Sequence, residues 1–248
     1  MKPNDIPRGQ LMPSLQAVPF LGLTGAAHIS LNRRQREALA GISERIVVPA
    51  KTLVYRQSEP AQFVFAISEG SVKSFRELPS GKREMAAFLF SHDLFGLGQD
   101  GLYLNSVETM VRSTIYRMPI ADLVSLLKRD GEIQFNFLVK VTHELREAQK
   151  RNVLLQRRDA SGRLAMFIVL MNRRVARTAI REPGVALPMT RSDIAAFLGL
   201  SMESVGRATA QLVKRGLVEF DGPRVARIID PIGLRKLIAA GGRRGDVV

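Results

Sequence analysis

A glutamate and an arginine stand four residues apart, at Glu203 and Arg207, in the segment 190–217. In a helix this spacing places both side chains on one face. An arginine guanidinium can donate two hydrogen bonds to O6 and N7 of guanine, and a glutamate can accept one from the amino group of cytosine. The pair therefore predicts contact with one G·C base pair in the major groove of DNA.

The residues around this pair predict two short helices joined by a turn. Thr190, followed three residues later by Asp193, resembles a capping box, and Ser201 is a second N-cap. Gly199 stands where a tight turn needs positive φ, and Gly216 is expected to end the second helix as its C-cap. This pattern predicts a helix-turn-helix. Its inward positions would be Ile194, Ala195, Phe197, Leu198, Val205, Ala208, Leu212 and Val213.

A β-hairpin is predicted directly after the second helix. Residues 217–220 and 225–229 are β-prone, and Asp221-Gly222 between them favours a hairpin turn. Helix-turn-helix plus hairpin is a winged helix, whereas an ordinary αα-hairpin would need neither the wing nor the local positive charge. Beside the base-contacting pair we expect Met202 and Gly206. Candidates for phosphate contacts are Thr190, Arg191, Ser201, Ser204 and Lys214.

Charge and composition narrow the class of protein. Lysine and arginine number 37 against 23 acidic residues, a formal charge of +14, and residues 160–248 carry 15 of the basic and 7 of the acidic residues. This excess favours a polyanionic partner, nucleic acid before an anionic membrane. The absence of cysteine excludes disulfides and thiolate-bound clusters. No catalytic motif of an enzyme is found.

No segment approaches the roughly 20 apolar residues that span a bilayer. Residues 11–27 resemble a signal peptide only faintly, because Pro13 and Pro19 interrupt them. We expect a cytoplasmic protein with an N-terminal arm and no membrane partner.

Short β-prone runs separated by turn residues occupy residues 46–117. They are 46–48, 52–55, 63–67, 72–75, 85–90 and 110–118. Such spacing predicts a small antiparallel barrel or roll. With the helices that follow, the expected fold class is α+β.

A heptad pattern follows, on a predicted helix from about 130 to 158. A helix with such a seam pairs with another helix, which favours a dimer, and a buried Asn152 would fix the register. The alternative is a helix packed on its own barrel. Lys140 falls among the flanking positions, which we expect to face solvent. The seam residues are Leu138, Val141, Leu145, Ala148, Asn152 and Leu155.

The stretch T-R-x-D-I-A-x-x-L-G-L-S-x-E-S-V-G-R resembles the recognition motif of the CRP/FNR superfamily of bacterial transcription regulators, in an FNR/FixK-like branch lacking cysteines. The resemblance covers nearly the whole chain. It implies an N-terminal cyclic-nucleotide-binding-like β-roll with its arm over 1–130, a dimerisation helix and hinge over 131–159, and a C-terminal winged helix over 160–248. It also implies a homodimer that binds palindromic DNA and contacts RNA polymerase.

The chain departs from the cyclic-nucleotide-binding members. By resemblance, Leu97 stands where those members have a ribose-binding glutamate, and Asn105-Ser106 lies where they have a phosphate-binding Arg-Ser pair. Ala148-Gln149 replaces the polar pair that holds adenine. A cyclic phosphate would lack its charge partner, so we expect no cyclic nucleotide and no cofactor.

The sequence is compatible with more than one signal. Haem or an unidentified small molecule could still be sensed, with His28, His92 and His143 as the only imidazoles, or the protein could act without any ligand.

The residues at the DNA-recognition positions match two different types of the superfamily. Met202 would suit a thymine methyl, as an apolar residue does in the FNR type, whereas Gly206 matches the cAMP-receptor type. We expect half-sites near TTGA, arranged as TTGA-N6-TCAA.

Overall fold

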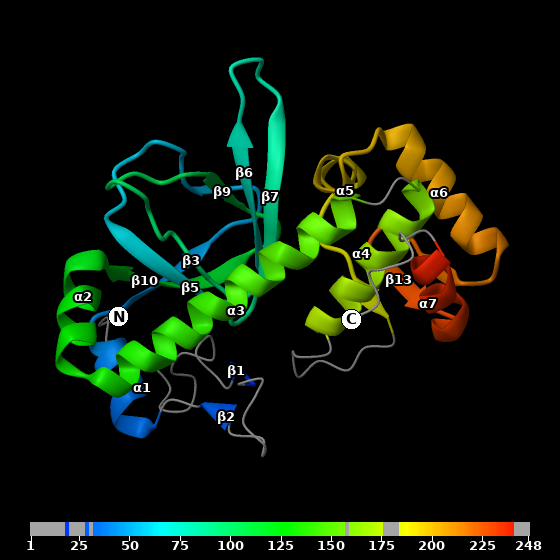
Figure 1. The fold of residues 1–248 in the computed structure, drawn as a ribbon. Coiled ribbons are helices and arrows are strands. Elements are labelled where there is room, and N and C mark those ends of the chain that lie inside the picture. Colours follow the sequence, from blue (N-terminus) through cyan, green and yellow to red (C-terminus); the bar gives the residue numbers. More distant parts are fainter. Residues whose placement is uncertain (1–17, 20–27, 30–31, 157–158, 176–183, 241–248) are drawn as a thin grey trace. The chain divides into compact units, whose positions relative to one another are not determined.

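The computed structural model describes residues 18–19, 28–29, 32–156, 159–175 and 184–240 (Figure 1). The chain divides into two compact units. The first comprises Met1–Ser80 and Ala87–Glu147, and the second comprises Gly81–Ala86 and Ala148–Val248. This division falls inside the long helix α3 (Gly131–Gln156), whereas the predicted boundaries at residues 130 and 159 stand on either side of that helix.

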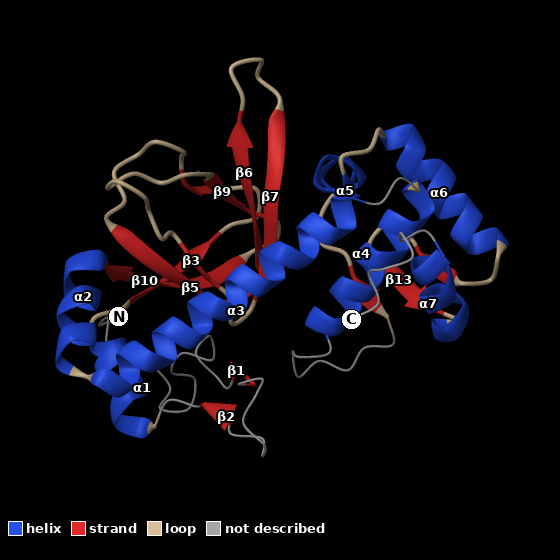
Figure 2. Ribbon diagram, in the orientation of Figure 1, coloured by secondary structure: helices blue, strands red, loops and turns tan. Residues whose placement is uncertain are grey.

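Two four-stranded antiparallel sheets form the β-roll of the first unit (Figure 2). One has the order β3-β10-β5-β8, built from Glu44–Val48, Ser113–Pro119, Phe63–Glu69 and Leu94–Phe95. The other has the order β4-β9-β6-β7, built from Leu53–Tyr55, Ser106–Thr109, Ser71–Glu77 and Arg83–Phe90. The predicted roll and the α+β class are confirmed. Strands β1 (Val18–Pro19) and β2 (His28–Ile29) form a separate pair.

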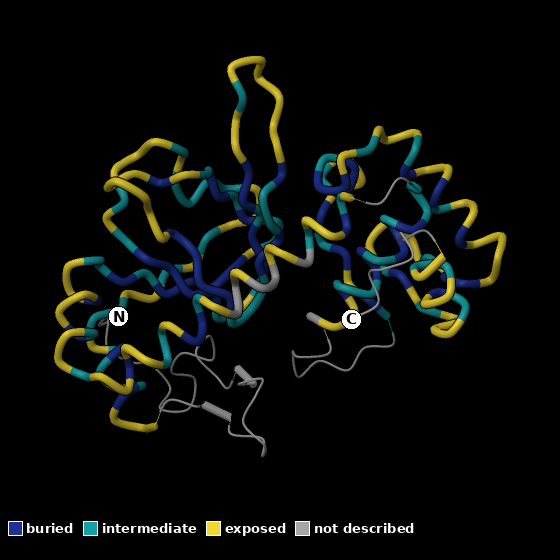
Figure 3. The backbone as a smooth tube through the Cα atoms, in the orientation of Figure 1, coloured by how far each residue is buried: buried dark blue, intermediate teal, exposed yellow. Residues whose placement is uncertain are grey.

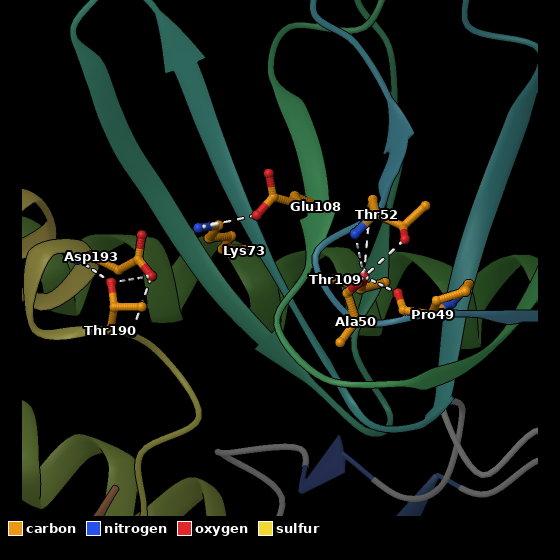
Figure 4. Close-up of polar contacts among 8 residues, drawn as sticks. All are labelled: Pro49, Ala50, Thr52, Lys73, Glu108, Thr109, Thr190 and Asp193. Atoms are coloured by element: carbon orange, nitrogen blue, oxygen red, sulfur yellow. Dashed lines mark hydrogen bonds and ion pairs between the residues drawn. The ribbon is translucent and has the colours of Figure 1, made fainter. Parts of the chain in front are cut away.

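The predicted strand over 110–118 is wrong in extent. Strand β9 ends at Thr109 and β10 begins at Ser113, because residues 110–112 carry the chain from one sheet to the other. The Thr109 hydroxyl anchors this crossing (Figure 4): it donates to the Pro49 carbonyl at 2.5 Å and accepts from the Thr52 amide at 3.0 Å. The β-prone residues of 110–118 concealed the change of sheet.

A cross-strand ion pair joins β6 and β9 beside this crossing. Lys73 Nζ lies 3.2 Å from Glu108 Oε1, and the two residues are direct partners in the register (Figure 4). Both side chains are largely shielded from solvent. Opposite charges at facing positions favour this register over a slipped one.

Strand β5 is buried on both faces, which explains its continuous apolar run (Figure 3). Phe65 and Ile67 point into the core between the sheets, with Val72, Val107 and Ile115. On the other face lies a second core that also takes residues from helices α1 (Arg33–Gly41), α2 (Ile120–Arg129) and α3. Its β5 members are Val64 and Ala66, and its helical members are Leu39, Leu123, Leu126 and Ile133.

The second unit is a helical domain with a small sheet. Its helices are α4 (Ala160–Val175), α5 (Arg191–Leu198), α6 (Met202–Lys214) and α7 (Pro231–Ala240). Its sheet has the order β11-β13-β12, from Val185–Ala186, Val225–Ile228 and Val218–Asp221. The predicted wing corresponds to β12 and β13, and β11 adds a third strand that the sequence patterns did not indicate.

Candidate nucleic-acid interface

Helix α5 begins with the predicted capping box (Figure 4). The Asp193 amide donates to the Thr190 hydroxyl oxygen at 3.1 Å, and the Thr190 amide donates to Asp193 Oδ2 at 3.0 Å. The reciprocal bonds satisfy two backbone N–H groups that the first turn would otherwise leave without acceptors.

The turn between the helices has the predicted backbone. Gly199 has φ of +62°, and its amide donates to carbonyls of α5. Ser201 then caps α6, because its hydroxyl oxygen accepts from the Ser204 amide at 3.1 Å. One prediction is off by a residue: Arg215, not Gly216, is the C-cap of α6, and Gly216 follows it with φ of +65°. The left-handed residue comes after the cap in the usual glycine-ended helix.

The inward face of α6 is apolar and packs against α4 and α5. Val205, Ala208 and Leu212 are at most 3% exposed, whereas the predicted inward residue Val213 is 45% exposed and lies off this face. The remaining surface of the helix is therefore free to meet another molecule.

The outward face of α6 carries the predicted pair. Arg207 Nη1 lies 3.4 Å from Glu203 Oε1, and their side chains are 69% and 77% exposed. Met202 is 58% exposed, and a Cβ added at Gly206 would meet nothing within 4 Å. The four predicted base-contacting residues thus share an open helix surface, where the ion pair holds the guanidinium over the N-terminal half of α6.

The five residues predicted to contact phosphate differ in whether they have a charge or a hydroxyl proton available for it. Arg191 and Lys214 are exposed. The Thr190 hydroxyl donates to Asp193 Oδ2 at 2.8 Å, and that of Ser201 donates to the Ser204 hydroxyl at 2.9 Å, so both protons serve the caps. In that arrangement Ser204 keeps its own hydroxyl proton for a ligand.

A hollow beside Arg207 lies between α6 and the start of α4. Its lining includes Arg207, Arg215, Ser204, Ser161 and Gln211. The two guanidinium groups and the Ser204 hydroxyl supply donors for an anion such as a DNA phosphate, whereas the Ser161 hydroxyl already donates to Gln211 Oε1. The sequence patterns did not single out Ser161, Gln211 or Arg215, because they join Arg207 only through the packing of α4 on α6.

Helix α3 has two different sides. Val139 and Leu154 are buried in their own units, whereas Leu138 is 61% exposed and Leu145 58% exposed. Of the other predicted seam residues, Ala148 and Asn152 are exposed, and Val141 and Leu155 are half-buried. Large apolar side chains gathered on an exposed face are typical of surfaces that contact another molecule. Phe135 and Val153 are further exposed apolar residues of this helix that the heptad pattern omits.

The roll contains a cavity of about 200 Å³ beside a stack of aromatic rings. The rings of Tyr55 and Tyr103 are stacked with centroids 3.8 Å apart. The Tyr103 hydroxyl donates to the Phe63 carbonyl at 3.0 Å. Burial raises the pKa of both tyrosines, so both stay neutral at physiological pH. Polar groups in the lining come from Ser74, Asn105 and Lys140, together with the tyrosines.

Lys140 overturns one prediction. It was expected to face solvent, but only 6% of its side chain is exposed, and its Nζ lies 3.7 Å from Asp93 Oδ1. The heptad pattern describes only the seam and its flanks, whereas the opposite side of α3 packs on the roll. A buried lysine next to a cavity is a feature that the sequence alone did not reveal.

Comparison with known families identifies two parts of the chain. Residues 45–130 match the model of the cyclic nucleotide-binding domain, and residues 162–237 match that of the Crp-like helix-turn-helix domain. This succession of domains, on the geometry described above, decides the family. The chain belongs to the CRP/FNR superfamily of bacterial transcription regulators.

Individual members of the superfamily are similar over most of their length. Transcriptional activator protein FnrA of Stutzerimonas stutzeri is 29% identical over 218 residues, covering 86% of this chain and 88% of that protein. The nitrogen fixation regulation protein FixK of Azorhizobium caulinodans is 27% identical over 205 residues, covering 82% and 83%. The structure of FixK2 from Bradyrhizobium japonicum superposes with a TM-score of 0.73 at 29% identity and covers 81% of this chain and all of that one.

The cavity fits a cyclic nucleotide poorly for a CRP/FNR protein. Leu97 and Asn105 line it, and no arginine or glutamate is among its described lining residues. Its one described cation, Lys140, already faces Asp93. About 200 Å³ is also below the roughly 300–1,000 Å³ usual for small-molecule sites.

Nor do the described residues form a metal site. Within the part of the chain that the structure describes, no group of three or more histidine, aspartate or glutamate side chains could hold a metal ion. His92 lies in the turn before β8 with its amide donating to the Ile67 carbonyl at 2.9 Å. The side chains of His28 and His143 lie outside the described residues. No described helix is long and apolar enough to cross a membrane.

Proposed function

We propose that this CRP/FNR protein is a homodimeric, sequence-specific DNA-binding regulator that works in the cytoplasm, contacts RNA polymerase and is gated by neither cAMP nor an iron–sulfur cluster. The observation that carries the proposal is the exposed Glu203–Arg207 pair on α6, with its side-chain atoms 3.4 Å apart. A sequence-specific DNA-binding protein must present hydrogen-bond donors and acceptors together to the edge of a base pair.

Support for the dimer comes from α3. Its exposed leucines follow the heptad seam from Leu138 to Leu155, and pairing of two such helices would cover them. A two-fold axis along the seam relates two recognition helices. Dimers of helix-turn-helix proteins bind half-sites about one helical turn apart, which supports an inverted repeat such as TTGA-N6-TCAA.

Selection of bound DNA from a random pool tests this function. We expect the purified protein to enrich an inverted repeat with one invariant G·C pair in each half. Enriched sites without a palindromic G·C pair would contradict the proposal. Repeating the selection with cell extract shows whether a cellular component is needed.

Gly206 provides a test of half-site preference. In the FNR type a serine stands at this position, and a side chain here would meet no protein atom within 4 Å. We therefore expect Gly206→Ser to fold normally and to sharpen the preference for the thymine next to the contacted G·C pair. Selection with both proteins measures the change, and an identical thymine preference would show that this position does not touch DNA.

The replacement of the ribose-binding glutamate and the phosphate-binding arginine predicts that cyclic nucleotides neither bind this protein nor change its affinity for DNA. With Leu97 and Asn105 at the cavity, a cyclic phosphate would be buried without a charge partner, which costs more than its hydrogen bonds return. Calorimetry with cAMP and cGMP should show no binding, and DNA affinity should not change when either is added. A micromolar dissociation constant for either nucleotide would overturn this part of the proposal.

The second candidate function is a ligand-gated regulator of the same family that uses haem or an unidentified small molecule. The cavity beside Lys140 favours the small molecule over haem, because a site of this size can hold a compound smaller than a nucleotide, whereas haem is larger than one. A Soret band in the purified protein, or a compound that co-purifies in native mass spectrometry, would decide for this alternative.

A further inference from the structure

A half-buried arginine, Arg151, lies at the centre of a contact network in the second unit. Its guanidinium donates to the carbonyl of Ala86 at 3.0 Å and to that of Met85. These two residues belong to the segment Gly81–Ala86 of the β6–β7 hairpin, which clusters with Ala148–Val248. The partners are about 65 residues away in the sequence, so no local pattern predicts them.

The same guanidinium also lies over an aromatic ring. Its central carbon is 4.7 Å from the ring centroid of Phe197 in α5. The N–H groups at the edge of the guanidinium therefore donate to the hairpin, while its face lies over the aromatic ring of α5. The planar guanidinium of arginine allows both contacts at once, whereas the ammonium group of lysine does not. Burial lowers the pKa of Arg151, and Glu84 opposes that shift; the group stays charged.

Helix α5 is held at a second point, by Arg163 of α4. Arg163 Nη1 donates to the Leu198 carbonyl at 2.9 Å, at the end of α5. Phe197 packs on Phe167 of α4 with ring centroids 5.6 Å apart. Since α5 packs directly on α6, whatever fixes α5 also fixes the helix that presents Glu203 and Arg207.

We propose that Arg151 is a positioning residue for DNA binding, one that couples the β6–β7 hairpin to α5 and so sets the placement of the recognition helix. The hairpin segment Gly81–Ala86, Arg151 and α5 all belong to the second unit, so the coupling acts within that unit. The inference rests on the proposed DNA-binding function but does not depend on any ligand.

Two substitutions test the role of Arg151, with one matched control. Arg151→Gln removes the charge and the paired donors, and Arg151→Lys keeps the charge but loses the planar fork. Arg129→Gln makes the same charge change at an exposed arginine of α2, whose guanidinium Nε donates to the Ser125 carbonyl of its own helix. All are studied as full-length proteins well below their unfolding temperatures, with circular dichroism to establish folding.

The first measurement is affinity for the selected DNA site over a range of salt concentrations. Coupling between two sites typically changes affinity about 5- to 150-fold. We expect Arg151→Gln and Arg151→Lys to weaken binding about tenfold or more with an unchanged salt slope, because no phosphate contact is lost. Arg129→Gln should keep wild-type affinity. A reduced slope for the Arg151 variants would overturn the proposal, since it would mean that Arg151 contacts a phosphate.

The second measurement is hydrogen exchange of the α5 amides without DNA. We expect faster exchange at the end of α5 in both Arg151 variants than in the control. If the wild-type protein selects no palindromic DNA, the proposed function is contradicted. Hydrogen exchange of the α5 amides then still tests whether Arg151 couples the hairpin to α5. Folded Arg151 variants with wild-type DNA affinity, or with wild-type α5 protection, would overturn the coupling itself.

Discussion

Leu145→Asp is expected to convert the dimer into monomers that no longer bind the palindrome. Leu145 is 58% exposed in the single chain and lies in the middle of the predicted seam. Near a two-fold axis the substitution would bury two unpaired carboxylates close together, each at a cost of several kcal/mol. At about 1.4 kcal/mol per factor of ten, dimer affinity should fall at least about a thousandfold.

Sedimentation and DNA binding measure the outcome together. Val124→Asp is the matched control, because Val124 is also an exposed apolar residue but lies on α2, away from the seam. It should remain a dimer with unchanged DNA affinity. If Leu145→Asp also remains a dimer with unchanged affinity, α3 is not the dimerisation helix.

Arg207→Ala should cost about 1–3 kcal/mol at each half-site and remove the preference for guanine there. The guanidinium is held near Glu203 before DNA arrives, so little side-chain freedom is lost when it meets the base. Two half-sites make the expected loss for the palindrome about twice as large. Binding to the selected site and to sites with a substituted G·C pair measures both effects.

Lys214→Ala separates base contact from charge. Lys214 is an exposed cation in the last turn of the same helix. Its loss should weaken binding to all sequences about equally and reduce the salt slope. Arg207→Ala should instead bring the selected and substituted sites to the same affinity. A guanine preference that survives Arg207→Ala would show that another residue makes the base contact.

The helix-turn-helix could be predicted from sequence because its signals are local. Thr190 caps an amide three residues away, Gly199 takes its left-handed φ within one turn, and Glu203 meets Arg207 one helical turn later. Backbone geometry fixes such short-range partners once the helix forms. The same holds for the roll: its strands are short apolar runs between turn residues, although the run over 110–118 hid a change of sheet.

Contacts between segments that are distant in the sequence were decided only by the tertiary structure. The heptad pattern on α3 identified an apolar seam, but only packing on the roll showed that Lys140 on the same helix is buried next to Asp93. Arg151 likewise has an unremarkable place in the sequence, and its partners Met85, Ala86 and Phe197 lie far from it along the chain. A periodic pattern shows that a residue lies on a helix face, whereas the identity of the surface against that face depends on how the whole chain folds.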